Sequence, residues 1–475
     1  MQSSAAQHKR MTQTPIPKLI SRLALPTVMS QLIMVIYNTA DTYFVSRIST
    51  AASGAVGVVF ALQSIIQAVG FGIAMGSQSI VSRRLGEKQD EQANVCASSA
   101  LLMTVTLGTL MLIVGLCTLE PLMRLLGATE TILPLACAYA RFILIGAPVM
   151  CASFLLNNIL RAEGHAVISM VGLCTGGVIN IALDPLLIFG LKMNISGAAL
   201  ATLISQCVSL VILSSFFIRK KTIVKLSPKH ISKKLGVYWS LIKIGFPTIC
   251  RQGMASVASA LLNRGAVMYG GSIAVIPQGA SEAVKAAAIA EAKDAALAAM
   301  TISNKIYMLV RNIVIGIGQG FQPVAGYNFG AGNKKRVKQA FNFSVLIGSI
   351  FCVCAAAFIA LFAPHIIAAF RDDPLVIKVG TLALYFCCVS VPLMAYSTFV
   401  NQLYQCLGYS LCATILASCR QGIFFIPIVL ILPRFIGLTG IQLVQPLSDV
   451  LTCIVSIPFH IAFFKLILNK RTENA

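Results

Sequence analysis

The chain has 475 residues, of which 57% are hydrophobic and 11% are charged, and 37 Lys and Arg against 15 Asp and Glu give a formal charge of +22. So apolar a composition excludes a soluble globular domain and indicates a protein that crosses a membrane many times. The basic excess raises nucleic-acid binding as an alternative, which depends on where the basic residues lie along the chain.

Apolar stretches of about 20 residues recur along almost the whole sequence, and each can cross a hydrocarbon core of about 30 Å as a helix. Residues 1–18 are polar and precede an apolar run that is long enough to span, so we expect no cleaved signal peptide. The sequence predicts an all-α membrane protein of about twelve transmembrane helices, at residues 20–45, 54–80, 94–117, 135–160, 167–190, 197–218, 246–270, 297–325, 341–363, 376–406, 411–432 and 438–468.

Lysine and arginine gather on one side of this topology. With the N-terminus inside, the basic clusters at 9–22, 83–88, 219–234, 334–338 and 465–471 all fall in cytoplasmic segments, and the opposite connections hold only scattered basic residues. This asymmetry is the positive-inside rule. We therefore expect both termini in the cytoplasm and a multi-pass protein of the plasma or inner membrane. Membrane topology then explains the basic excess, and we expect no nucleic-acid partner.

The second half of the chain repeats the first. "LALPTVMSQ" at 23–31 resembles "IGFPTICRQ" at 244–252, and "GSQSIVSRRLG" at 76–86 resembles "GFQPVAGYNFG" at 320–330. Six spans return the chain to its starting side, so the repeats run parallel and predict two six-helix lobes. The predicted organisation is a cytoplasmic tail at 1–18, an N-lobe at 19–218, a basic cytoplasmic linker at 219–245, a C-lobe at 246–468 and a C-terminal tail at 469–475.

The number of residues between a segment of the first half and its match in the second half is about 23 larger for the second match than for the first. This difference places an extracytoplasmic insertion in the C-lobe at about 272–296. The Ala-rich stretch at 277–300 carries several charges and follows Pro277 and Gly279, so it is expected to form a water-exposed helix. It can be an outward extension of the eighth span, or a lid or a docking segment.

Three acids fall inside predicted spans: Asp41, Asp184 and Asp449. A carboxylate in a span costs roughly 2.5–3.5 kcal/mol, so one that is retained usually faces a cavity or an ion path. The first and fifth spans run in the same direction, which puts Asp41 and Asp184 at similar heights in the membrane. The alternative is that each Asp only hydrogen-bonds a neighbouring helix.

The neighbours of these acids are oxygen-bearing. Asn180 lies one helical turn before Asp184, Pro185 can free backbone carbonyls, and Thr202 of the sixth span reaches the same height. Two carboxylates with amide, hydroxyl and carbonyl oxygens suit a Na⁺ ion, and they equally suit a shared proton. The sequence therefore predicts a cation site at Asp41, Asn180, Asp184 and Thr202.

Catalytic signatures are absent from the sequence. It contains no G-x-x-x-x-G-K-[ST], H-E-x-x-H or G-x-S-x-G motif, and its five histidines are scattered. The fifteen cysteines form no C-x-x-C pair and are expected to be small core residues. We therefore expect neither an enzyme nor an ATPase, with no cofactor and no metal beyond Na⁺.

Several stretches together resemble the multidrug and toxic compound extrusion (MATE) family, and most closely its DinF-type branch. The likeness covers essentially the whole chain apart from 272–296 and is carried by "LPTVMSQLIMVIYNTADTYFVS", "GSQSIVSRRLGEKQDEQA", "LLNNILRAEGHA", "GGVINIALDPLLIFG" and "GIGQGFQPVAGYNFGAG". By this resemblance, Asp41, Asn180 and Asp184 match the acidic coupling site of that branch, and Thr202 adds an oxygen ligand. The residues that would line the N-lobe cavity are Tyr37, Tyr139, Asn157 and Asn158.

The resemblance also implies a mechanism. A V-shaped pair of lobes around a central cavity would open alternately to either side of the membrane, and inward flow of Na⁺ or H⁺ would drive export of amphipathic organic compounds by a monomer. The C-half carries more basic residues than a cavity for organic cations would be expected to have, namely Lys305, Arg311 and Arg420 alongside Asp449. If these residues line a C-lobe cavity, the alternative is a flippase or exporter of an anionic or lipid-linked substrate. A channel or receptor would give no reason for duplicated halves.

Overall fold

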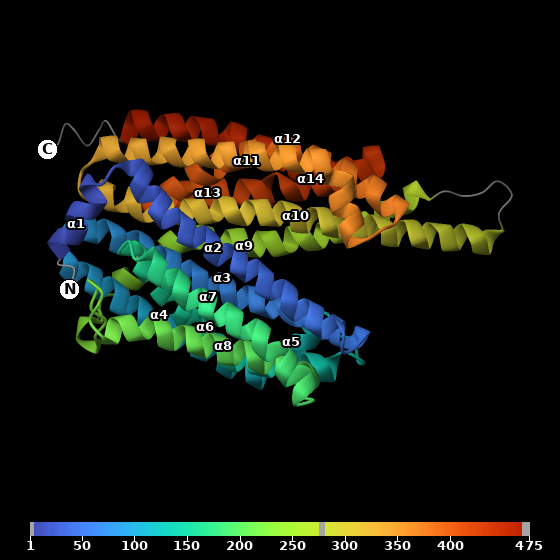
Figure 1. Ribbon diagram of the computed structural model, residues 1–475, viewed down its shortest axis with the longest axis horizontal. Coiled ribbons are helices and arrows are strands. Elements are labelled where there is room, and N and C mark those ends of the chain that lie inside the picture. Colours follow the sequence, from blue (N-terminus) through green and yellow to red (C-terminus); the bar gives the residue numbers. More distant parts are fainter. Residues whose placement is uncertain (1–3, 275–280, 468–475) are drawn as a thin grey trace. The chain divides into compact units, whose positions relative to one another are not determined.

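The computed structural model describes residues 4–274 and 281–467, and these are almost entirely helical (Figure 1). The predicted C-terminal tail at 469–475 and part of the predicted insertion lie outside the described residues. The elements of the first half are α1 (Ser4–Gln13), α2 (Ile16–Ser46), α3 (Thr50–Gly86), α4 (Asp90–Cys117), α5 (Leu119–Leu125), α6 (Leu133–Ala162), α7 (Ala166–Pro185), the π-helix η1 (Leu186–Gly190) and α8 (Asn194–Ile218).

The linker between the halves contains one short 3-10 helix, η2 (Pro228–His230). The elements of the second half are α9 (Leu235–Gly270), η3 (Gly271–Ile273), α10 (Glu282–Gly330), α11 (Lys334–Phe370), α12 (Pro374–Cys406), α13 (Ser410–Ser418), the π-helix η4 (Cys419–Ile423), α14 (Phe425–Ala462) and the π-helix η5 (Phe463–Ile467).

The helices provide twelve membrane crossings, as the sequence predicts. Among the described residues, nine helical stretches are long and apolar enough to span, and one of them is the 56-residue stretch Ser410–Lys465. A helix rises about 1.5 Å per residue, so this stretch is far longer than one crossing of about 30 Å. Its backbone breaks at Ile436 and Gly437, where φ is 58° at the glycine, and so it makes two crossings. The more polar α9 and α10 add two more, with 36 and 49 residues.

The chain divides into two compact units by its internal contacts. Unit 1 comprises Met1–Gly253, Gly316–Phe341 and Leu403–Leu411, and unit 2 comprises Met254–Ile315, Asn342–Gln402 and Cys412–Ala475. Unit 1 therefore contains the whole predicted N-lobe together with one end each of α9, α10, α11, α12 and α13. The candidate site in α2, α6, α7 and α8 lies entirely within unit 1.

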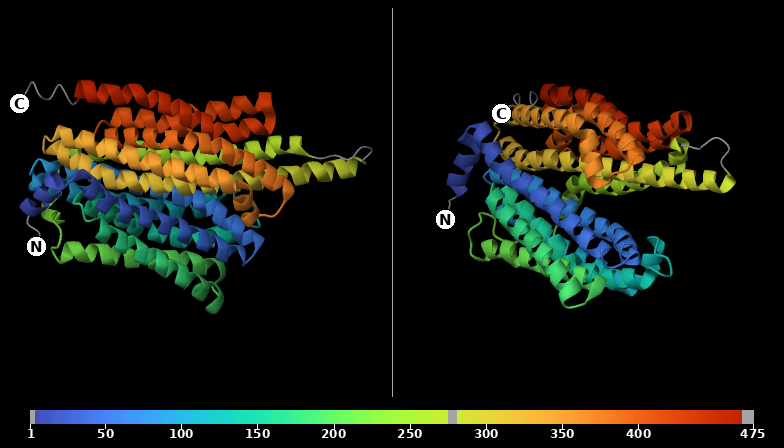
Figure 2. Two further views of the ribbon diagram at one scale, coloured as in Figure 1. Left: turned by 45° about the horizontal axis from the view of Figure 1, so that its top comes forward. Right: turned by 45° about the vertical axis from the view of Figure 1, so that its right-hand side comes forward.

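The central helix of unit 1 is α6, which packs on α3, α4 and α8. Of its most apolar 18-residue window, 83% is buried, against 22–44% in α2, α3, α4, α7 and α8. Beside it, α7 runs along α2 and packs on α8 (Figure 2). A Cβ atom at Gly176 would lie 2.0 Å from Ser209 Oγ of α8, and one at Gly177 would lie 2.8 Å from Ile33 Cγ2 of α2. Two adjacent glycines thus let α7 approach both neighbours closely.

In unit 2, the Ala-rich stretch from Glu282 onward forms the first part of α10 and continues without a break into the predicted eighth span. This part of α10 extends past the ends of the other helices of the unit (Figure 1). Glu282 and Lys285 are paired and exposed near its start. Further along, Ala292 and Ala296 are buried, and the close approach of Ala296 to Gly270 shows that small residues seat this part of α10 on the end of α9.

Candidate functional site

Two acids from distant parts of the sequence meet in unit 1. Asp41 lies on α2, and Asp184 lies at the end of α7, fully buried. The two side chains are close enough for their charges to interact. Tyr139 of α6 donates a hydrogen bond from its hydroxyl to Asp41 Oδ2 at 3.3 Å. The two acids, for which the helical rise predicts similar heights, thus lie in one site because α7 packs along α2.

The amide of Asn180 connects α7 to α8. Its Nδ2 donates to Asp184 Oδ1 at 3.4 Å, one turn along the same helix face, and to Thr202 Oγ1 at 3.4 Å. All four residues that the sequence assigns to a cation site therefore lie together, on α2, α7 and α8. Tyr139 joins them from α6.

Three oxygens of this site have no hydrogen-bond partner although they are buried: Asp41 Oδ1, Asn180 Oδ1 and Asp184 Oδ2. A buried acceptor without a partner costs about 1–3 kcal/mol, and more when it is charged. Oxygen atoms of this kind are the ligands that hard cations prefer, and a proton on one carboxyl would relieve the same cost. The residues present thus fit a monovalent cation or a proton.

The backbone at the end of α7 is irregular. Pro185 has no N–H, so the carbonyl of Ile181 lacks its ordinary donor in α7. The five-residue π-helix η1 follows directly. A π-helical turn inside or beside an α-helix widens the backbone spacing and is frequent at functional sites. The end of α7 is therefore the least regular part of the site.

A small cavity of about 30 Å³ is lined by Asn180 and Thr202 of the site. A cavity needs only about 10–15 Å³ of such volume to hold a water molecule, so this one has room for water or a small ion. Its polar lining comes from three helices and includes Ser30 and Tyr37 of α2, Asn180 of α7, and Thr202, Ser205 and Gln206 of α8.

Two of the four residues expected at the N-lobe cavity make contacts elsewhere. Tyr37 lines the small cavity, as noted, but Asn157 and Asn158 do not. Both asparagines are buried on α6, where Asn157 Nδ2 donates to the carbonyl of Ser169 at 2.9 Å and Asn158 Nδ2 donates to that of Phe154 at 2.7 Å. Their amides hold helix backbones in place.

Sequence reasoning missed Arg161, which is only 2% exposed at the end of α6. Its Nε donates to Ser169 Oγ at 3.0 Å, and its Nη1 donates to the side-chain oxygen of Gln319 on α10. The residue stands within "LLNNILRAEGHA", where a basic residue at a helix end fits the positive-inside rule equally well. Only the structure distinguishes this buried arginine from a solvated one.

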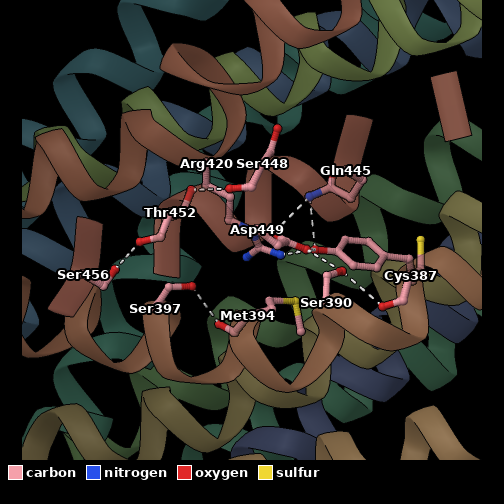
Figure 3. A network of polar contacts seen from close by, with 11 residues as sticks. Cys387, Ser390, Met394, Ser397, Arg420, Gln445, Ser448, Asp449, Thr452 and Ser456 are labelled. Carbon is pink, nitrogen blue, oxygen red and sulfur yellow. Dashed lines mark hydrogen bonds and ion pairs between the residues drawn. The ribbon is translucent and has the colours of Figure 1, made fainter. Parts of the chain in front are cut away.

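A second polar cluster lies within unit 2 (Figure 3). Asp449 of α14 is fully buried, and Arg420 of η4 donates from Nε to its Oδ1 at 2.8 Å. Tyr307 of α10 donates to Asp449 Oδ2 at 2.5 Å and accepts from Arg420 Nη2. Gln445 and Ser390 add donors to the same carboxylate, at 3.2 and 3.4 Å. Asp449 is thus fully occupied by partners.

The remaining basic residues of the predicted C-lobe cavity do not join this ion pair. Arg311 lies within electrostatic reach of Arg420 and Asp449, and its buried Nε has no partner. Lys305 is exposed on α10. Of the four residues expected around a C-lobe cavity, the structure therefore joins Arg420 and Asp449, with Arg311 nearby. Tyr307, which completes the cluster, carried no signal in the sequence.

Among the residues that the structure describes, no three His, Cys, Asp or Glu side chains gather where they could hold a metal ion. The donor set in unit 1 is thus two carboxylates with neutral oxygens. Such oxygen donors can hold a hard cation or a proton, and they differ from the nitrogen and sulfur ligands that zinc prefers.

Known proteins resemble this chain in both sequence and fold. The multidrug export protein MepA of Staphylococcus aureus is 26% identical over 432 residues, which cover 90% of this chain and 90% of MepA. A structure described as the outward-facing conformation of a multidrug resistance MATE family transporter of the MOP superfamily has a TM-score of 0.88 and 25% identity, covering 97% of this chain and 98% of the other.

A MOP superfamily transporter from Pyrococcus furiosus, whose binding pocket is described as having reverse polarity that suggests a different function, has a TM-score of 0.86. It is 25% identical and covers 96% of this chain and 98% of its own. The family model MatE matches residues 26–186 and 273–431 of this chain. With its helical spans and with most of its length matched by that model, the chain belongs to the MATE family and is a membrane transporter rather than an enzyme.

Proposed function

We propose that the protein exports amphipathic organic compounds across the cell membrane, and that binding of Na⁺ or H⁺ at Asp41 and Asp184 drives the export. The carrying observation is the pair of carboxylates in one buried site, with three oxygens that lack a hydrogen-bond partner. The names of the relatives, a multidrug export protein and a multidrug resistance transporter, support the substrate class. The acids lie in the N-lobe, which favours the DinF-type branch.

The coupling follows from linkage. A cation on the two acids would neutralise their repulsion and change how α2, with Pro26, packs on α7, with Pro185. A ligand shifts an equilibrium between two conformations only through its different affinity for them. If the cation-bound packing has the lower affinity for the drug, cation entry and drug release are linked reciprocally. Alternating access then converts the cation gradient into export.

The orientation belongs to the same proposal. Basic residues are dense in the connection between α8 and α9 and at the start of α11, and the last turn of α3 carries Arg83 and Arg84. The positive-inside rule places these segments, and with them both termini, in the cytoplasm. Entry of the coupling cation then occurs from the opposite side, down the gradient that the cell maintains.

A second candidate, export of an anionic or lipid-linked substrate, is favoured by one observation. Arg311 is a cation near the Arg420 and Asp449 pair with a buried nitrogen that has no partner. A related transporter is described as having a pocket of reverse polarity. However, Arg420 is neutralised by Asp449 and Lys305 is exposed, so the uncompensated positive charge at this cluster is that of Arg311 alone. Export of organic compounds is the better-supported function.

Everted membrane vesicles test the proposal. Dye or drug movement is measured under an imposed Na⁺ or H⁺ gradient for the wild-type chain, for Asp41→Asn and for Asp184→Asn. Glu120→Gln, at an exposed acid of α5, is the matched control. We expect both aspartate variants to reach the membrane in normal amounts and to lose gradient-driven transport, while the control retains it. Unchanged transport in both aspartate variants would exclude the site.

A further inference from the structure

One end of unit 1 contains an open cavity of about 580 Å³ that the transport site does not use. It forms where α1, the start of α2, the turn between α6 and α7, and the end of α8 come together, at the end of the unit that carries the N-terminus (Figure 1). Its titratable lining consists of Arg10, Arg22, His165, Arg219, Lys220 and Lys221. Among the residues that the structure describes, the lining includes no Asp or Glu.

The five Arg and Lys side chains have no acidic partner. Within 4–274 and 281–467, none of them forms an ion pair. The positive charge of Arg10 is therefore disfavoured: burial and the neighbouring charge of Arg22 lower the pKa of its guanidinium. Like charges that are brought together without counter-charges favour the binding of an anion.

The acid next to the lining residue Gly164 in the sequence is engaged elsewhere. Glu163 is fully buried, and its carboxylate accepts the backbone N–H groups of Ile223 and Val224 at 3.2 and 2.9 Å. His165 Nε2 lies 3.7 Å from the same carboxylate. Glu163 therefore faces the linker, and the arginines and lysines of the cavity remain uncompensated.

A helix N-terminus adds backbone donors to these cations. The 20-residue α7 begins at Ala166, and no side chain caps it. The first backbone hydrogen bond of this helix runs from Ser169 N to His165 O at 3.1 Å. The N–H groups of residues 166–168 precede it and have no acceptor within the helix. Residues 166–168 are part of the cavity lining. An uncapped N-terminus with nearby arginines is a site that phosphate groups prefer.

The end of α8 brings three consecutive basic residues to the cavity. Lys220 has a φ of 51°, and Lys221 N donates to Phe216 O at 3.0 Å, which closes the helix. Glycine is the usual residue in this left-handed position, because a side chain there strains the backbone. A lysine thus occupies a position where backbone geometry alone would favour glycine.

The cavity lies where spanning helices end. Leu23 of α2, Val167 of α7 and Ile168 of α7 form part of its lining, and Val167 is 51% exposed. Ile218, immediately before the basic turn of α8, is 77% exposed. Exposed apolar side chains of spanning helices face lipid chains, so the adjoining cations lie at the level of lipid headgroups. Basic pockets between transmembrane helices on the cytoplasmic side are known to bind acidic lipid headgroups.

We propose that this basic cavity binds a phosphate group, and its position favours the headgroup of an anionic phospholipid over a soluble phosphate. A bound phosphate would bridge α1, α2, α7 and α8, of which the last three also hold the candidate cation site. The lipid composition of the membrane would thereby stabilise the helices that the transport cycle must move.

Thermal unfolding of the full chain in detergent tests the proposal. The probes are phosphatidylglycerol, phosphatidylcholine as the neutral lipid, and inorganic phosphate. The test variant is Arg22→Gln/Lys220→Gln/Lys221→Gln. The control, Lys229→Gln/Lys233→Gln/Lys234→Gln, removes the same charge from linker residues outside the cavity. We expect phosphatidylglycerol to raise Tm in wild type and control, with an affinity about a hundredfold lower in the test variant.

Without lipid, the test variant should unfold at the same temperature as the wild type or higher, because it loses only like-charge repulsion, and this shows that it is folded. Stabilisation by inorganic phosphate, lost in the same variant, would support the phosphate site and assign it to a soluble ligand. Equal stabilisation by phosphatidylglycerol in wild type and test variant, or an equal loss in the control, would overturn the proposal. So would equal effects of the two lipids.

Discussion

Tyr139 on α6 donates a hydrogen bond to Asp41 on α2, 3.3 Å away, and leaves the other oxygen of that carboxylate without a partner. The tyrosine has one proton to donate, so it can satisfy only one acceptor. Asp184 is in the same condition, with Asn180 bound to one oxygen at 3.4 Å and nothing bound to the other. Each acid thus has one buried oxygen without a hydrogen-bond partner.

This arrangement predicts how ligand binding changes stability. We expect saturating Na⁺ to raise the Tm of the wild-type chain if Na⁺ is the coupling ion, since a ligand at a hundred times its Kd stabilises by about 2.7 kcal/mol. Asp184→Asn should show no Na⁺ response and should unfold no earlier than the wild type without Na⁺, because it removes repulsion between neighbouring carboxylates.

Differential scanning fluorimetry in Na⁺ and in choline buffers provides the measurement, repeated over a range of pH. A Tm that responds to pH but not to Na⁺, and that loses the response in Asp184→Asn, would identify the proton as the coupling ion. Na⁺ and pH responses that both persist in Asp41→Asn and Asp184→Asn would contradict the assignment.

The cluster in unit 2 predicts strong coupling between two residues. Arg420→Met should destabilise the protein by about 3–5 kcal/mol, because it leaves the carboxylate of Asp449 buried without its charged partner. Replacing both, with Arg420→Met/Asp449→Leu, should recover most of that loss, since apolar residues often replace a buried ion pair without cost. A double-mutant cycle on unfolding in denaturant measures the coupling. Additive losses would show that the pair does not act as a unit.

The number of spans and the height of the acids could be predicted from the sequence. Both depend on counting residues along helices that must cross a bilayer of fixed thickness. Rotation about the helix axis could not be predicted in the same way, because lipid-facing and protein-facing sides of these helices are both apolar. The family resemblance therefore placed Tyr139 at the N-lobe cavity, but its hydrogen bond to Asp41 came only from the structure.

The ion pair of Arg420 and Asp449 shows the same limit in the second half. The sequence shows that each residue is unusual within a span. It does not show that the two residues, 29 apart in the sequence, contact each other, because Arg420 lies on the irregular turn η4. The basic cavity is a further case. The positive-inside rule gives the side of the membrane on which Arg22 and Lys220 lie, but it does not say that they gather around one cavity.

Close packing of α7 predicts a specific steric effect at Gly176. Gly176→Ala would place Cβ 2.0 Å from Ser209 Oγ and should destabilise by about 1–3 kcal/mol. The displacement of α7 from α8 should also separate Asn180 from Thr202 and weaken cation coupling. Gly253→Ala is the control, since nothing lies within 4 Å of its Cβ position. It should be neutral or stabilising by up to about 1 kcal/mol.

Thermal unfolding and vesicle transport check this prediction together. Gly176→Ala/Ser209→Ala should recover part of the stability, because the hydroxyl that causes the closest contact is removed. Equal Tm values for Gly176→Ala and Gly253→Ala would show that α7 and α8 are free to separate at this point.

Glu163, outside the spans, predicts a pH-dependent attachment of the linker. Burial raises the pKa of this carboxyl from its ordinary 4.5 to about 8, although two backbone N–H groups of the linker oppose the shift. A raised pKa means that the folded state holds a proton which the unfolded state has lost. The stability that Glu163 contributes is therefore fully present below about pH 4.5 and is lost progressively as the pH rises to about 8.

Comparison with Glu163→Gln isolates this effect, since glutamine fills the same space and does not titrate. We expect the variant to gain stability relative to the wild type as the pH rises from 5 to 8, by up to a few kcal/mol, and the difference to stay constant above that range. Amide exchange at Ile223 and Val224, which donate to Glu163, reports the local opening. A stability difference that does not change with pH, together with unchanged exchange at these two amides, would mean that Glu163 does not hold the linker.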